Sequence, residues 1–268
     1  AVRYNLGIGY TNNQGEQKDV LKKLNLYWNN SVNIAPGLTV DVNLKYTSQR
    51  SKSGTPSLSS LSYSGKSVPY MDFLDESQQP ARLDLTYSSE FMDQYYPGKL
   101  LSWDYIPLED YKHSVSTTDL TEWYALANAK YQVFDFLDFT SGLQIQSQQN
   151  RNTTQHDPES YYARVLINQF TEINSASNSV KYNIPIGGIK KDDVVSGSSY
   201  TWRNQFNLAK VWTDFDLKAI FGSELRQNKI EGNSMQVYGY DSDPLRTSPV
   251  DYSRTFPTLP LGANYSIT

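Results

Sequence analysis

Seven stretches of the chain alternate apolar and polar residues along nearly their whole length. Between Leu24 and Ile34, and again between Leu38 and Tyr46, apolar residues recur at alternate positions. A strand, with a period of two, separates such residues onto opposite faces, whereas a helix, with a period of 3.6, mixes them. The pattern therefore predicts strands with one apolar and one polar face, near residues 2–12, 22–34, 37–49, 118–133, 136–149, 200–213 and 215–228.

The lengths of these strands and of their connections point to a membrane. Each strand has about ten residues or more, which is the length that a tilted strand needs to cross a bilayer and exceeds the usual five or six of a soluble sheet. The turns near 35–37, 134–136 and 213–214 are short, whereas the links near 50–117, 150–199 and 229–268 are far longer than the loops of compact domains. Antiparallel strands place successive connections at opposite ends, so we expect short turns on one side and long loops on the other. This is typical of outer-membrane barrels, which have short periplasmic turns and long extracellular loops.

The expected fold class is therefore all-β, an antiparallel transmembrane β-barrel segment in the outer membrane of a Gram-negative cell. The mean hydropathy of −0.59 fits a barrel, because every second strand residue faces a wet interior. No run of eighteen apolar residues occurs, which excludes a bundle of membrane helices. The net charge of −4 argues against a nucleic-acid partner.

The ends of the sequence also affect the interpretation. Residue Val2 is already in a predicted strand, and seven strands cannot close a barrel. An open sheet of this kind would leave two long edges and an exposed apolar face. We expect residues 1–268 to be a segment of one larger barrel domain, with the remaining strands elsewhere.

No sequence motif indicates catalysis or a cofactor. Gly65-Lys66-Ser67 resembles the end of a phosphate-binding loop, but Ser60 stands where that motif needs glycine. His113 and His156 have no second histidine or serine elbow at a useful spacing, so we expect both on the surface of loops. The chain has no cysteine, which excludes disulfides and thiolate metal sites. We expect no enzymatic activity, no metal and no cofactor.

The first long link is rich in aromatic and acidic residues. Aromatic faces beside hydrogen-bonding groups can hold sugars or peptides, and the candidate contacts for cargo or for a lid are Tyr70, Trp103, Tyr105 and Tyr111. The alternative is that these rings form the small core that a loop of this length needs to stay ordered. Further on, residues 160–173 predict a short helix with Tyr162, Val165, Leu166 and Phe170 on one side.

Several segments are similar to SusC/RagA-type TonB-dependent transporters, and the similarity covers essentially the whole chain in the family's order. They are GKLLSWDYIPL at 98–108, SYYARVLINQF at 160–170, YNIPIGGI at 182–189, WRNQFN at 202–207 and AIFGSELR at 219–226.

The resemblance implies a barrel of roughly twenty-two strands, of which this chain would supply an early third without the plug. Family members import oligosaccharides or peptides, usually beneath a SusD-like surface lipoprotein that closes as a lid, with energy from TonB acting on the plug. The apolar faces would then meet lipid, and the polar faces would line the lumen or contact the plug. The family has no universal substrate residue, so no binding position is carried over.

A second interpretation stays open on the sequence alone. The chain could be a secreted or surface β-sandwich that binds carbohydrate or acts as an adhesin, with its apolar faces packed sheet on sheet. That interpretation predicts two layers of strands with their apolar sides together.

Overall fold

The computed structural model describes residues 2–15, 18–55, 61–63, 66–67, 72–85, 87–174, 176–260 and 262–268. The long strands are β1 (Val2–Gln14), β2 (Val20–Ala35), β3 (Leu38–Gly54), β6 (Ser114–Phe134), β7 (Leu137–His156), β10 (Gly188–Val211) and β11 (Asp216–Ser242). The short strands are β4 (Ser62–Tyr63), β5 (Lys66–Ser67), β8 (Thr171–Asn174), β9 (Ser179–Tyr182), β12 (Leu245–Ser248), β13 (Thr255–Pro257) and β14 (Asn264–Ser266). The helices are α1 (Ser89–Tyr95), α2 (Pro107–His113) and α3 (Tyr161–Gln169).

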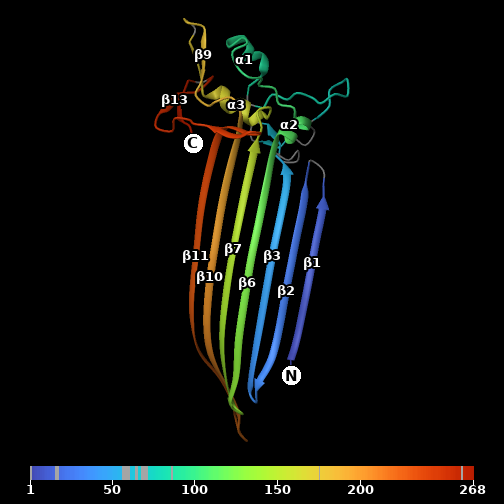
Figure 1. Cartoon of the computed structure of the whole chain (residues 1–268), viewed down its shortest axis with the longest axis vertical. Coiled ribbons are helices and arrows are strands. Elements are labelled where there is room, and N and C mark those ends of the chain that lie inside the picture. Colours follow the sequence, from blue (N-terminus) through green and yellow to red (C-terminus); the bar gives the residue numbers. More distant parts are fainter. Residues whose placement is uncertain are drawn as a thin grey trace.

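One antiparallel sheet dominates the molecule. Its eight strands follow the order β1-β2-β3-β6-β7-β10-β11-β12, so the long strands lie beside their neighbours in the chain. Figure 1 shows the seven long strands side by side, with the three helices gathered at one end, which we call the loop end; the opposite end is the turn end. The curled, open sheet confirms the expected fold class of a partial antiparallel barrel.

The connections follow the expected asymmetry with one exception. At the turn end, Pro36 and Gly37 alone link β2 to β3, and Gly37 adopts the positive φ of 75° that the tight turn requires. At the loop end, however, β1 and β2 are joined by a short hairpin in which the Gly15 amide donates to the Asp19 carbonyl at 2.9 Å. The expectation that all short turns lie on one side was therefore wrong for this pair.

Two of the three long links are much shorter than the sequence predicted. The link expected at 150–199 spans only 157–187, because β7 continues to His156 and β10 begins at Gly188. The link expected at 229–268 starts after Ser242, the end of β11. The extension of β7 from Asn150 to His156 is polar on both faces, and the few apolar residues in the extensions of β10 and β11 do not alternate regularly, so a sequence pattern does not detect these strand ends.

The buried core lies at the loop end rather than within the sheet. It is built around α3, β10, β11 and the last strands, and consists of Ala163, Ile167, Phe170, Ile184, Ile189, Tyr238, Phe256 and Ile267. The helix expected at 160–173 ends at Gln169, and Thr171 begins β8 instead. The side-chain oxygen of Ser160 accepts a hydrogen bond from the Ala163 amide at 3.2 Å and caps the helix.

No second layer of strands covers the apolar face in the part of the chain that the structure describes. The β-sandwich interpretation required such a layer, so it is wrong for these residues. None of the helices in the described ranges is long and apolar enough to cross a membrane.

Candidate functional site: an apolar wall and a loop-end cavity

The strand register places most apolar residues of the seven long strands on one face, although a few, such as Leu126 and Ile220, lie on the other. One row across the sheet runs through Leu6, Trp28, Leu44, Ala125 and Ile145, each directly opposite the next. These side chains are not covered by other parts of the protein: Trp123, one row away, is 60% exposed, and Phe221 on β11 is 77% exposed. A continuous exposed apolar face of this size indicates contact with another apolar phase.

The opposite face carries paired polar and charged side chains. Arg203 bonds to Glu224 across β10 and β11, with the Nε to Oε2 distance 2.7 Å. Lys130 and Asp138 form an ion pair at 2.9 Å between β6 and β7. Hydrogen bonds such as Thr47 Oγ1 to Asn25 Oδ1 at 3.1 Å continue the pattern. This face therefore suits a wet interior.

The apolar face is a band that slopes across the strands. On β2 the band ends toward the loop end at Leu24. The directly paired residues of the successive strands lead from Leu24 to Glu231 on β11. On β11, however, the band ends at Leu225, six residues closer to the turn end. At the turn-end edge, the band on β3 ends at Leu38, and the directly paired residues lead from Leu38 to Phe221 on β11. On β11 the band continues past Phe221 to Leu217, four residues closer to the turn end.

This slope gives the tilt of the strands relative to the band. The first shift is about 20 Å along a strand over five strand spacings of about 24 Å, and the second is about 13 Å over four spacings of about 19 Å, which gives a tilt of about 35–40°. Strands in outer-membrane barrels tilt by about 35–45° to the membrane normal. A horizontal layer of lipid around tilted strands would produce such a slope.

Aromatic rings border the band on both sides. Toward the loop end, Tyr46 packs on Trp123 with ring centroids 4.3 Å apart. At the turn end, Phe134 stacks on Phe136, and the Lys210 ammonium lies over the Phe136 ring at 4.4 Å from its centroid. Amphipathic rings and long cationic side chains are favoured at the two membrane–water interfaces.

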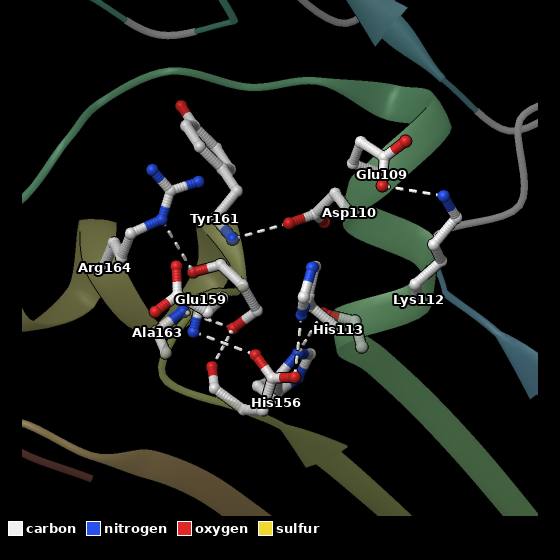
Figure 2. Close-up of polar contacts among 12 residues, drawn as sticks. Glu109, Asp110, Lys112, His113, His156, Glu159, Tyr161, Ala163 and Arg164 are labelled. Carbon is white, nitrogen blue, oxygen red and sulfur yellow. Dashed lines mark hydrogen bonds and ion pairs between the residues drawn. The ribbon is translucent and has the colours of Figure 1, made fainter. Parts of the chain in front are cut away.

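The second feature is a cavity of about 530 Å³ at the loop end, on the polar face of the sheet. Three contacts join the α2–β6 junction to the segment that links β7 and α3. Asp110 of α2 accepts the Tyr161 amide at 2.6 Å, His113 pairs with Asp157 at 2.8 Å, and Ser114 bonds to the His156 ring at 2.9 Å. Figure 2 shows Asp110 pointing from α2 toward the first turn of α3.

Most of the cavity wall is apolar. The lining residues are Thr55, Leu85, Tyr105, Asp110, Ser114, Thr154, His156, Tyr161, Tyr162, Val165, Leu166 and Gln169. Burial lowers the pKa of His156 to about 4, so the imidazole is neutral at physiological pH. Burial also raises the pKa of Asp110, an effect that the hydrogen bond from the Tyr161 amide partly opposes. The cavity therefore presents a neutral imidazole and one buried carboxyl group in an apolar surrounding.

Side chains of α3 hold the 99–106 segment in place beside the cavity. Asn168, which is fully buried, receives the Leu101 amide on Oδ1 and donates to the Leu101 carbonyl from Nδ2, both at 2.8 Å. Arg164 donates to the carbonyls of Ser102 at 3.0 Å and Asp104 at 2.8 Å. These contacts fix a long segment that has little regular structure of its own.

The four candidate contact residues have different surroundings. Tyr70 lies outside the described residues. Trp103 is only 4% exposed and packs edge-on against Tyr87, with ring centroids 5.9 Å apart, so it belongs to the small core of the loop. Tyr105 is also buried but lines the cavity, whereas Tyr111 is half-buried and lies outside the lining. Contact of any of them with cargo stays a prediction.

The expected position of the histidines was wrong for His156. It is the last residue of β7 and lines the cavity, because the pairing of β6 with β7 sets it opposite Ser114. His113 ends α2 rather than lying in an irregular loop. In the described part of the chain, no three His, Asp or Glu side chains come close enough together to hold a metal ion.

Comparisons with known proteins support the fold. No protein-family model matches the chain, and no curated protein sequence matches it. Solved structures do match: the RagAB peptide importer in its closed-closed state and the RagAB peptide transporter each align with a TM-score of 0.59 and 15% sequence identity. Each alignment covers 90% of this chain but only 24% of the other chain. The chain is therefore similar in fold to part of a transporter component, and it spans about a quarter of that protein's length.

Proposed function

We propose that this chain forms part of the barrel wall and the extracellular loops of a TonB-dependent outer-membrane transporter. The sloping apolar band carries the proposal, because only a lipid layer around tilted strands accounts for both its exposure and its slope. The likeness in fold to RagAB components supports the same conclusion. The loop end then faces outward, and the polar face lines the lumen or meets a plug.

A peptide is the cargo that the cavity favours. Leu85, Val165, Leu166 and the tyrosine rings make most of the exposed wall apolar, and the polar groups of Asp110, Ser114 and His156 in the lining are already hydrogen-bonded within the protein. An oligosaccharide would leave many of its hydroxyl groups without partners there, which is costly in a buried site. An apolar peptide side chain loses little on entering it. The proposed partners are those of the family: a SusD-like lipoprotein above the loops, and TonB acting through a segment outside this chain.

Detergent dependence tests the membrane assignment. We expect the purified protein to stay monodisperse only in detergent or lipid, and to give protease-protected strands in vesicles. A folded, monodisperse protein in plain buffer would contradict the assignment, since the band would then be covered in another way.

A matched pair of variants tests the cavity. The Tyr162 ring lines the cavity and stacks on His156, with ring centroids 4.2 Å apart. In the complete transporter we expect Tyr162→Ala to weaken binding of apolar peptides about tenfold, the loss of one buried aromatic contact of about 1–1.5 kcal/mol. Tyr252→Ala, an exposed tyrosine outside the lining, is the control. Equal effects of the two variants, or binding of oligosaccharides but not peptides, would contradict the cavity assignment.

A further inference from the structure

The apolar face of the sheet contains a hollow that the transport function does not require. It has a volume of about 250 Å³ and its exposed lining is almost entirely apolar. The hollow lies near the loop-end edge of the band, and its apolar wall is formed by Leu6, Leu26, Trp28, Leu44, Tyr46, Trp123, Ala125 and Ile145.

This hollow, which we call the groove, adjoins a row of small residues on β6. Ala125, Ala127 and Ala129 occupy three successive outward positions. They are flanked by larger side chains from β3, and Ala125 and Ala127 also by Ile145 and Leu143 of β7. The row of small side chains extends from the groove along β6 for about 13 Å, the length of four residue steps. Such a depression matches the shape of a single flexible hydrocarbon chain better than it matches the flat surface of a bilayer.

Positive charge gathers on the same face just beyond the loop-end edge of the band. Lys22 lies directly opposite Arg50, and Lys52 follows two positions later on the same face of β3. Neighbours of this kind have their Cβ atoms about 5–7 Å apart. Asp119 pairs with Arg50 at 2.6 Å, whereas neither lysine has an ion-pair partner within the described ranges. The cluster keeps a net positive charge facing outward.

The distance between groove and cluster fits a lipid. Arg50 lies four residues beyond Tyr46, about 13 Å along the strand and about 11 Å along the membrane normal at a tilt of about 35°. The headgroup layer begins at the edge of the hydrocarbon and is about 5–8 Å thick, and lysine and arginine side chains can reach down to it. An acyl chain in the groove would thus hold its phosphate next to Lys22, Arg50 and Lys52.

We propose that this groove and cation cluster form a binding site for a phosphorylated, multiply acylated glycolipid of the outer leaflet, of the lipid A type. The inference rests on the proposed function, because it needs the apolar face to lie in the membrane with the loop end outward. The charge selects the ligand: three clustered cations with one carboxylate match a headgroup with more than one phosphate better than a lipid with a single phosphodiester.

Native mass spectrometry of the purified transporter in detergent, with added lipid A or phosphatidylglycerol, tests the site. We expect wild type to retain lipid A in preference to phosphatidylglycerol. Replacing both lysines, Lys22→Gln with Lys52→Gln, should weaken retention about 25-fold, since each basic residue near a charged lipid surface contributes about a fivefold effect. Filling the groove with Ala125→Phe should weaken it without changing the charge.

The control is Lys23→Gln, because Lys23 is adjacent to Lys22 but on the opposite, polar face. It removes the same charge and should leave lipid A retention unchanged. Equal retention in wild type and the double lysine variant, or equal retention of the two lipids, would overturn the inference. If either outcome occurs in a protein that still needs detergent, the lipid site is refuted and the membrane assignment stands. A protein that is stable without detergent would refute both the lipid site and the membrane assignment.

Discussion

A single charge placed on either face of β3 separates a lipid-facing wall from any other arrangement. Val42 lies at the middle of the apolar band on β3, between Leu38 and Tyr46, and its neighbours across the strands are Asn30 and Ala127. Asn43 is the next residue and faces the polar side. The perturbation is Val42→Arg, with Asn43→Arg as the matched variant in the same strand.

The structure sets the expected magnitude. An arginine on the lipid face at mid-depth costs about 2–4 kcal/mol, whereas one near an interface costs about 0–1 kcal/mol. Val42→Arg should therefore lower the free energy of unfolding by about 2–4 kcal/mol, or about 30- to 1,000-fold in the folded-to-unfolded ratio. Asn43→Arg faces water and should cost about 0–1 kcal/mol.

Urea titration of the complete transporter refolded in lipid vesicles, followed by tryptophan fluorescence and by heat-dependent gel mobility, measures both values. Ser48→Arg, on the apolar side but beyond the edge of the band, should fall close to Asn43→Arg. Equal costs for Val42→Arg and Asn43→Arg would refute the lipid-facing assignment. So would a cost for Ser48→Arg as large as that for Val42→Arg, because the effect would then not depend on depth.

Three further predictions concern packing and titration. A Cβ at Gly7 would overlap the Tyr27 ring, whereas a Cβ at Gly9 would meet only Asn25, in ordinary contact at 3.9 Å, so Gly7→Val should cost about 1–3 kcal/mol in urea unfolding and Gly9→Val almost nothing. Asn168→Ala leaves the half-buried Leu101 amide and carbonyl without their side-chain partner and should cost about 1–3 kcal/mol, seen as faster proteolysis of the 72–106 segment; Asn168→Asp, which would bury a carboxylate with one oxygen facing the Leu101 carbonyl, should cost no less. The pKa of His156 in the folded protein is about 4, below its usual 6.5. The stability that neutral His156 contributes is therefore fully present above pH 6.5 and is lost as the pH falls toward 4, by up to about 3 kcal/mol. Thermal melts of the loop end should show this loss in wild type and not in His156→Asn.

The sequence predicted the parts of the fold that obey a simple period. Leu24 to Ile34 and Leu38 to Tyr46 alternate because one face meets an apolar phase and the other meets water, so the strands could be recognised. Beyond the band, as in the stretch from Asn150 to His156, both faces are wet and the alternation disappears. The strands continue there only because neighbouring strands supply the backbone hydrogen bonds.

The cavity was not predictable from local pattern. Its residues Asp110, Ser114, His156 and Tyr161 are brought together by the register of β6 with β7, which no short window of sequence contains. One signal was available and was not used: Pro107 followed by Glu109 and Asp110 is a typical helix start, and it would have placed Asp110 in a helix leading into a strand. Tyr105 was selected from composition alone.

Under the proposed function, the length of β10 determines how far the cavity lies from the bilayer. From Tyr200, at the edge of the band, to Ile189, in the core beside the cavity, the strand runs eleven residues, about 36 Å along its axis and about 30 Å in height at a tilt of about 35°. Sheet of this length bends little, so the height of the cavity would not change with bilayer thickness. A peptide bound there, as proposed, would be held well above the lipid headgroups, where a partner approaching from the medium could reach it.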